Sequence, residues 1–203
     1  MKIKICGLFR DEDIEYVNEA GPDYAGFVFA GGRRGVDFKT AARLRQSLAA
    51  GIEPVGVFVN APIDEVAALY ADGVISLAQL HGGEDGAYIA SLKERCGVRI
   101  IKTVLCPPQG MPVVPVCGET AADFLLFDSG SGSGKAFDWS LLDFTRKTPP
   151  PVRWFLAGGI NRDNITTAIS LNPFCIDVSS GAESGGLKDR AKIKELVGIA
   201  CGN

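Results

Sequence analysis

The sequence predicts an α/β protein in which residues 1–203 form a single (β/α)8 barrel domain. The stretches predicted as strands are continuously apolar, which is typical of a parallel sheet buried on both faces. They alternate with amphipathic stretches, as the crossover helices of such a sheet require. Eight repeats in about 200 residues match the lower size limit of a closed barrel. A doubly wound open sheet is the alternative, but it more often has five or six strands.

The first half of the chain supplies five strands with a helix between each pair. Gly7 ends the first strand, Gly21 ends the first helix, and Pro62 and Gly73 mark the start and end of the third helix. The predicted strands are residues 2–6, 24–30, 54–59, 74–80 and 99–104, and the predicted helices are 11–20, 40–50, 62–73 and 84–96.

The second half supplies three more strands and departs once from the repeat. Residues 106–119 contain four prolines and two glycines, so a regular helix there would lose several hydrogen bonds. We therefore expect a proline-rich loop in place of helix 5. The remaining strands are predicted at 123–127, 153–157 and 174–178, and the remaining helices at 139–145, 163–171 and 191–200.

Composition limits the classes of function. The net charge of −3 is spread over 24 acidic and 21 basic residues without a long like-charged run, so we expect no nucleic-acid partner. The chain shows neither a secretory leader nor a membrane-spanning apolar run, which indicates a cytoplasmic protein without a membrane partner. Six cysteines without a C-x-x-C pair, and a single histidine, argue for reduced thiols and against a metal site.

Reactive and phosphate-compatible residues follow the predicted strands, at the edge where a barrel carries its chemistry. Cys6, His81 and Asp128 each stand at such a strand end. Glycine pairs and serines follow the last two strands, in AGGINRDN and DVSSGAE. Backbone N–H groups there can hold a phosphate, because glycine lets the main chain approach it closely. Glycines that merely end the strands are the alternative interpretation.

The stretch DSGSGSGKAFDW at 128–139 resembles a phosphate loop only superficially. Its glycines at 130 and 134 are one residue too close for a P-loop, and Ala136 stands where a hydroxyl is needed. We interpret it as a mobile rim segment that begins with Asp128. Taken singly, Asp128 could serve only to form a turn, and Cys6 could be an inert buried thiol. Arg33 and Arg34 could be solvated charges or an anion clamp.

Several segments in order along the chain resemble phosphoribosylanthranilate isomerase, a barrel enzyme of tryptophan biosynthesis. They are KICGL at 4–8, VGVFVN at 55–60, QLHG at 79–82, FDSGSGSGKAFDW at 127–139, LAGGINRDN at 156–164, DVSSGAE at 177–183 and GLKD at 186–189. The resemblance implies an Amadori rearrangement of N-(5-phosphoribosyl)anthranilate to 1-(2-carboxyphenylamino)-1-deoxyribulose 5-phosphate. It also implies that no cofactor or metal is needed.

The resemblance assigns a role to each matching position. Cys6 is implied as the general base and Asp128 as the general acid. Arg34 is implied as the partner of the anthranilate carboxylate, with Arg33 as the alternative. Further substrate contacts are implied for His81 and Asp177, and backbone phosphate contacts for Gly158, Gly159, Ser180 and Gly181. The expected partner is a phosphorylated sugar bound by a monomer or homodimer.

Two other classes of protein share part of this pattern. Related sugar-phosphate barrels, such as aminoimidazole ribotide isomerase or indole-glycerol-phosphate synthase, would share the phosphate-binding glycines. The former has an aspartate where Cys6 stands, and the latter uses a larger set of Lys and Glu, so Cys6 argues against both. A catalytically inert phosphate-binding barrel would not need a thiol and an acid at its rim.

Overall fold

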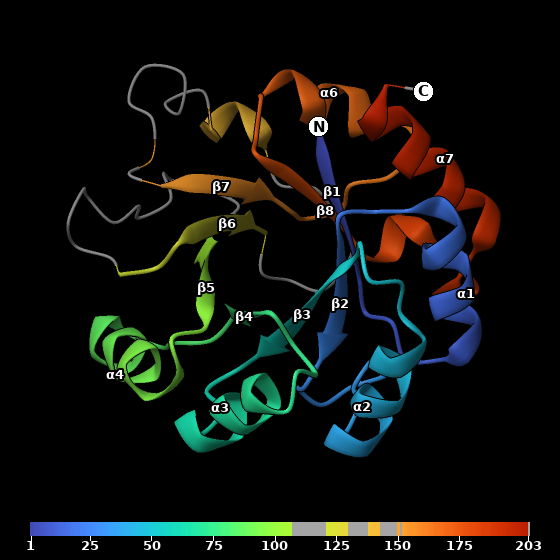
Figure 1. Cartoon of the computed structure of the whole chain (residues 1–203). Helices are drawn as coiled ribbons and strands as arrows, with labels where there is room; N and C mark the ends of the chain where they lie inside the picture. Colours follow the sequence, from blue (N-terminus) through green and yellow to red (C-terminus); the bar gives the residue numbers. More distant parts are fainter. Residues whose placement is uncertain (107–120, 130–137, 143–149, 151, 203) are drawn as a thin grey trace.

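Eight parallel strands close into a barrel in the computed structural model, which describes residues 1–106, 121–129, 138–142, 150 and 152–202 (Figure 1). The strands follow chain order, and β1 (Lys2–Cys6) pairs on one side with β2 (Tyr24–Val28) and on the other with β8 (Cys175–Val178). This closure confirms the predicted barrel and excludes the open sheet.

The elements fall close to their predicted positions. The other barrel strands are β3 (Glu53–Phe58), β4 (Leu77–Leu80), β5 (Arg99–Leu105), β6 (Phe124–Asp128) and β7 (Arg153–Leu156). The helices are α1 (Asp11–Ala20), α2 (Phe38–Ser47), α3 (Ile63–Ala71), α4 (Gly86–Cys96), α6 (Ile165–Ser170) and α7 (Arg190–Cys201), with short 3-10 turns η1 (Trp139–Leu142) and η2 (Ser180–Ala182). Within the described ranges, no helix is long and apolar enough to cross a membrane.

Three local features differ from the prediction, and two of them have visible causes. Strand β4 begins at Leu77, because the backbone N–H groups of Val74 and Ile75 donate to the carbonyl of Leu69 and continue the end of α3. Helix α2 begins earlier than expected, because the carboxylate of Asp37 accepts from the N–H of Thr40 and caps it. A hairpin of β9 (Glu183–Ser184) and β10 (Leu187–Lys188) was not predicted. The predicted replacement of helix 5 lies outside the described residues.

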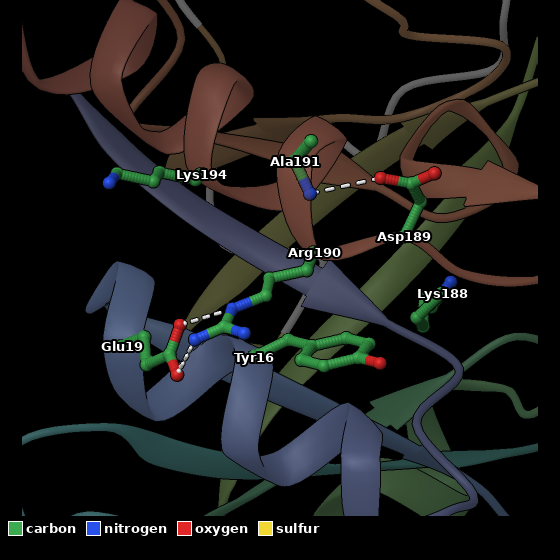
Figure 2. A pocket seen from close by; sticks show the side chains of 7 residues that line it. All are labelled: Tyr16, Glu19, Lys188, Asp189, Arg190, Ala191 and Lys194. Atoms are coloured by element: carbon green, nitrogen blue, oxygen red, sulfur yellow. Dashed lines mark hydrogen bonds and ion pairs between the residues drawn. The ribbon is translucent and has the colours of Figure 1, made fainter.

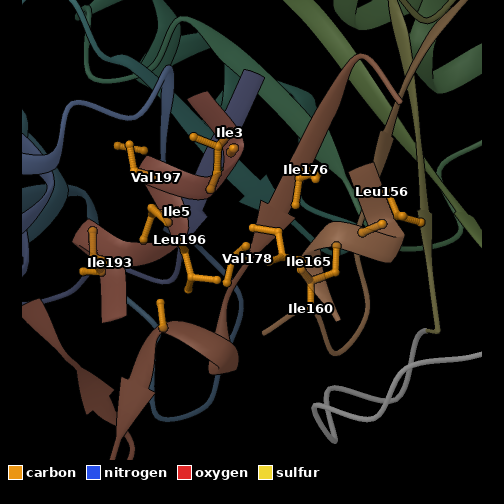
Figure 3. Packing of buried hydrophobic residues seen from close by; sticks show 14 of the residues in the cluster. Ile3, Ile5, Leu156, Ile160, Ile165, Ile176, Val178, Ile193, Leu196 and Val197 are labelled. Atoms are coloured by element: carbon orange, nitrogen blue, oxygen red, sulfur yellow. The ribbon is translucent and has the colours of Figure 1, made fainter. Parts of the chain in front are cut away.

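Alternation along each strand separates the barrel interior from the outer layer. Ile3 and Ile5 of β1 face outward and pack with residues of α7 such as Leu196, as Figure 3 shows. Lys4, between them, and Cys6, which follows Ile5, face inward because successive side chains of a strand point to opposite faces. The inner face therefore carries the polar groups, and the outer face carries the larger hydrophobic core.

Helices α1 and α7 cover the seam where the last strand meets the first. Arg190, the first residue of α7, donates from Nε to Oε2 of Glu19 on α1 at 2.7 Å (Figure 2). Asp189 caps α7 by accepting from the N–H of Ala191 at 2.9 Å. These contacts fix the start of α7, and with it the loop that follows β8.

Candidate active site

A cavity of about 440 Å³ opens at the carboxyl ends of the strands. Of the nine site residues predicted from the sequence, it is lined by eight: Cys6, Arg34, His81, Asp128, Gly158, Gly159, Asp177 and Ser180. Gly181 and the alternative Arg33 do not line it. A second cleft, of about 620 Å³ (Figure 2), is formed by α1, Lys188, Asp189 and the first turns of α7, and it shares no lining residue with this cavity.

Cys6 is the last residue of β1, and its thiol faces the cavity with only 8% of the residue exposed. Burial raises the pKa of this thiol, because a thiolate loses the hydration that stabilises it in water. The positive charges of Lys4 and Lys188 act in the opposite direction and lower it. A Cβ at Gly26 would lie 2.8 Å from the sulfur, so glycine on β2 leaves room for Cys6.

Lys4 is fully buried inside the barrel and was not predicted as part of the site. Its Nζ donates to Oδ2 of Asp177 at 2.8 Å and to Oε1 of Gln79 at 2.7 Å. Burial opposes its charge, but attraction to Asp177 and Cys6 outweighs that cost and leaves the pKa of Lys4 raised. The signal in the sequence was a lysine at an inward-facing position in the middle of the short first strand.

Asp177 lines the cavity and has one carboxylate oxygen without a partner among the described residues. Its Oδ2 is held by Lys4, whereas its Oδ1 is buried and accepts no hydrogen bond from the part of the chain that the structure describes. A buried carboxylate oxygen without a donor is costly. The arrangement therefore suits a ligand that brings a hydroxyl or N–H group to Asp177.

His81 and Asp128 face each other across the cavity, from the end of β4 and the end of β6. The imidazole Nε2 lies 3.6 Å from Oδ2 of Asp128. On the other side of the ring, Nδ1 lies 3.2 Å from Nε2 of Gln79 and 3.1 Å from Oγ1 of Thr103. Burial lowers the pKa of His81, and the negative charge of Asp128 only partly opposes this effect. His81 is therefore neutral at pH 7.

Arg34 reaches the cavity from the loop after β2 and is held there by Glu183. Its Nε and Nη2 donate to the two carboxylate oxygens at 2.6 and 3.0 Å. Arg33 also donates to Glu183, at 2.8 Å, but its side chain is 48% exposed, against 24% for Arg34. A Cβ at Gly7 would lie 2.5 Å from Cδ of Arg34, so the glycine lets the arginine lie over the end of β1.

The loops after β7 and β8 meet at the remaining side of the cavity. Gly158 and Gly159 have φ angles of +88° and +67°, which glycine adopts without strain. Gly181, in the loop after β8, packs closely against Ile160 in the loop after β7. A Cβ at Gly181 would lie only 2.0 Å from the carbonyl oxygen of Ile160. The two loops thus place backbone from Gly158, Gly159 and Ser180 at the cavity surface, while Gly181 permits their contact.

The site combines a thiol, a carboxyl group and an anion-binding arginine in one cavity. Cys6 lies on β1 and Asp128 on β6, with β7 and β8 between them. A molecule in the cavity can therefore be met by a base from one side and an acid from another, as acid–base catalysis requires. The segment after Ser129, at 130–137, lies outside the described residues, and so does its predicted role as a mobile rim.

Comparison with known families gives one consistent match. The family described as N-(5'phosphoribosyl)anthranilate (PRA) isomerase matches residues 3–198. The N-(5'-phosphoribosyl)anthranilate isomerase of Endomicrobium trichonymphae is 52% identical over 204 residues, which cover 98% of this chain and 97% of the relative. That of Lachnoclostridium phytofermentans is 40% identical over 213 residues, with 97% and 96% covered.

Solved structures agree with the sequence matches. Phosphoribosyl anthranilate isomerase from Thermus thermophilus superposes with a TM-score of 0.87 at 30% identity, covering 100% of this chain and 99% of that one. A phosphoribosyl anthranilate isomerase in complex with reduced 1-(o-carboxyphenylamino)-1-deoxyribulose 5-phosphate superposes with a TM-score of 0.80 at 29% identity, with both chains fully covered.

Proposed function

The chain belongs to the N-(5'-phosphoribosyl)anthranilate isomerase family, and from this membership we propose how its cavity performs the reaction. The enzyme catalyses the Amadori rearrangement of N-(5-phosphoribosyl)anthranilate to 1-(2-carboxyphenylamino)-1-deoxyribulose 5-phosphate, a step of tryptophan biosynthesis. The observation that carries the mechanism is the presence of Cys6 and Asp128 on separate strands of one cavity.

The first step opens the furanose ring. Asp128, in its protonated form, donates its proton to the ring oxygen while the C1′–oxygen bond breaks. The lone pair of the anthranilate nitrogen forms a double bond to C1′, which leaves an iminium ion and a C4′ hydroxyl group. A positioned acid is needed because an alkoxide is a poor leaving group at neutral pH.

The second step moves a proton away from C2′. The thiolate of Cys6 removes this proton, which the neighbouring iminium ion has made acidic, and the electron pair neutralises the iminium nitrogen. The resulting enolamine tautomerises to the ketone of the product. Lys4 supports this step because its positive charge favours the thiolate, against the effect of burial.

Four further contacts orient the substrate in this proposal. Arg34 pairs with the anthranilate carboxylate, since it lines the cavity and Arg33 does not. Asp177 accepts from a sugar hydroxyl through its unused Oδ1, and His81 donates to the substrate or to Asp128. The 5-phosphate is held by backbone N–H groups of Gly158, Gly159, Ser180 and Gly181.

We also propose the domain organisation and the setting of the enzyme. Residues 1–203 form one barrel domain, which works without a cofactor or metal. The enzyme acts in the cytoplasm, as a monomer or homodimer. Its partner is the phosphorylated sugar substrate, and neither nucleic acid nor a membrane is involved. One solved structure contains monomers generated from the dimeric phosphoribosylanthranilate isomerase of Thermotoga maritima, so that relative has been obtained in both states.

Genetic complementation tests the function. A bacterial strain without its own phosphoribosylanthranilate isomerase should grow without tryptophan when it expresses this chain. It should fail to grow when it expresses the Cys6→Ser or Asp128→Asn variant at the same level. Failure of the wild-type chain, expressed in soluble and folded form, would contradict the assignment.

A further inference from the structure

The orientation of the Gln79 side-chain amide is fixed by Lys4. A lysine ammonium carries three donors and no acceptor, so the Gln79 atom 2.7 Å from Nζ must be the amide oxygen. Lys4 cannot turn away, because it is fully buried and its charge is held by Asp177 at 2.8 Å. The amide nitrogen of Gln79 is consequently the end that faces His81.

This orientation determines which ring nitrogen of His81 carries the proton. The Gln79 amide nitrogen lies 3.2 Å from Nδ1, and an amide nitrogen can only donate. Nδ1 must therefore be the unprotonated nitrogen, and the proton of the neutral ring lies on Nε2. That nitrogen faces Oδ2 of Asp128, at 3.6 Å.

We propose that Lys4 and Gln79 are positioning residues that keep the proton of neutral His81 on Nε2, so that the imidazole cannot take the proton that Asp128 gives to the substrate. This inference rests on the proposed role of Asp128 as the acid. An Nε2 with a free lone pair would face Asp128 and accept its proton, because imidazole is a stronger base than a carboxylate. With Nε2 protonated and Nδ1 bound to an N–H donor, His81 has no site for a second proton.

The charges around His81 act in the same direction. Four charged groups act electrostatically on the ring: Lys4 from β1, Lys102 from β5, Asp177 from β8 and Asp128 from β6. The two lysines and burial disfavour the imidazolium, and together they outweigh the two carboxylates. Protonation of Nδ1 would also break the contact with Gln79. The hydrogen bonds from Lys4 through Gln79 to His81 and the charges around the ring therefore both keep His81 neutral.

The single histidine of the chain makes the proton position directly measurable. In protein labelled with ¹⁵N-histidine, long-range ¹H–¹⁵N correlations near pH 8 distinguish a protonated from an unprotonated ring nitrogen without overlap from other residues. The wild-type protein should show one set of signals, with the proton on Nε2. A dominant proton on Nδ1 would overturn the inference.

The Gln79→Glu variant tests the hydrogen bonds from Lys4 through Gln79 to His81, with Thr103→Val as its matched control. The glutamate keeps an acceptor for Lys4 but replaces the amide donor by an acceptor, so the Nδ1 of His81 should become protonated. Valine removes the hydroxyl that lies 3.1 Å from Nδ1 but leaves the Gln79 amide in place, so the proton should stay on Nε2. An unchanged signal in Gln79→Glu, or a proton moved to Nδ1 in Thr103→Val, would overturn the inference.

Kinetics separate this inference from the role of Asp128. In Gln79→Glu, kcat should fall by about 10²-fold at neutral pH, the contribution of one general acid, with a smaller change of KM. A kcat within about twofold of wild type, despite a proton on Nδ1, would overturn the functional part of the inference. If Asp128→Asn kept full activity, the proposed acid would be wrong, whereas the position of the proton on His81 would still be read from the spectrum.

Discussion

Arg34 and Glu183 form a two-point ion pair at the edge of the catalytic cavity. Nε and Nη2 of the guanidinium donate to the two carboxylate oxygens at 2.6 and 3.0 Å, and Lys188 reaches the same carboxylate at 2.9 Å. The pair links the loop after β2 to the hairpin after β8. It holds a planar donor group at the cavity before any substrate is bound, which lowers the entropy cost of binding an anion.

Arg34→Lys should weaken substrate binding. A lysine cannot reproduce the fixed fork of an arginine, and loss of a charged hydrogen bond of about 1.5–3 kcal/mol corresponds to a KM increase of roughly 10- to 10²-fold. Steady-state kinetics should show a smaller change of kcat. Arg33→Lys is the matched control and should alter KM less than about threefold, since its side chain lies outside the cavity lining. The reverse order would transfer the role to Arg33.

The ionised carboxylate of Glu183 should make the free energy of unfolding depend on pH in the acid range. Burial opposes its ionisation, but hydrogen bonds from Arg34, Lys188 and Arg33 outweigh it and lower the pKa of Glu183 from 4.5 to about 2. Because the folded-state pKa is depressed, the stability from this carboxylate is complete above pH 4.5 and is lost as the pH falls toward 2. The free energy of unfolding, measured in urea between these pH values, should fall more steeply for wild type than for Glu183→Gln. Equal slopes would contradict this account.

Lys4→Met should destabilise the protein far more than Lys2→Met, although both lysines lie on β1 and both pair with an aspartate. Lys4 and Asp177 have side chains 0% and 6% exposed, and removal of one partner of such a pair costs about 3–5 kcal/mol. Lys2 and Asp23 are 43% and 29% exposed, and such pairs contribute about 0–1 kcal/mol. Urea unfolding of the two variants measures the difference. Comparable losses would show that the buried pair is not a stabilising element.

Ionisation of Cys6 should limit activity at low pH. Burial raises the pKa of this thiol, so the thiol form predominates in the free enzyme at neutral pH and the thiolate fraction increases as the pH rises. kcat/KM should therefore rise with pH on the acid side of its optimum. The ultraviolet absorbance of the thiolate, taken as the difference between wild type and Cys6→Ser, should titrate over the same range. A difference spectrum that is constant between neutral and alkaline pH would contradict the assignment.

The fold and most of the cavity could be predicted because they depend on local sequence. Continuous apolar strands and their spacing indicated the barrel, and strand ends indicated Cys6, His81 and Asp128. The contacts that tune these residues could not be predicted, because they join strands far apart in the chain. Lys4 meets Asp177, 173 residues away, and Gln79, 75 residues away, only once the barrel has closed.

Other features of the site could not be predicted from the sequence for similar reasons. The ion pair of Arg34 joins residues 149 positions apart, so nothing local showed that Glu183 rather than solvent meets its charge. Gly181 is predicted to contact phosphate, and the structure adds a second role, because the absence of a side chain there lets the loops after β7 and β8 touch. A glycine pattern indicates that a backbone approaches something closely, but it does not say what is approached.

The most direct test of the mechanism is the turnover of phosphoribosylanthranilate by wild type, Cys6→Ser and Asp128→Asn. The substrate is generated in place from anthranilate and phosphoribosyl pyrophosphate, and its fluorescence decay is followed at neutral pH. The account predicts rapid decay with wild type and a kcat lower by about 10²- to 10⁴-fold in each variant, with the fold retained by circular dichroism. Decay at the wild-type rate in either variant would contradict the acid–base pair.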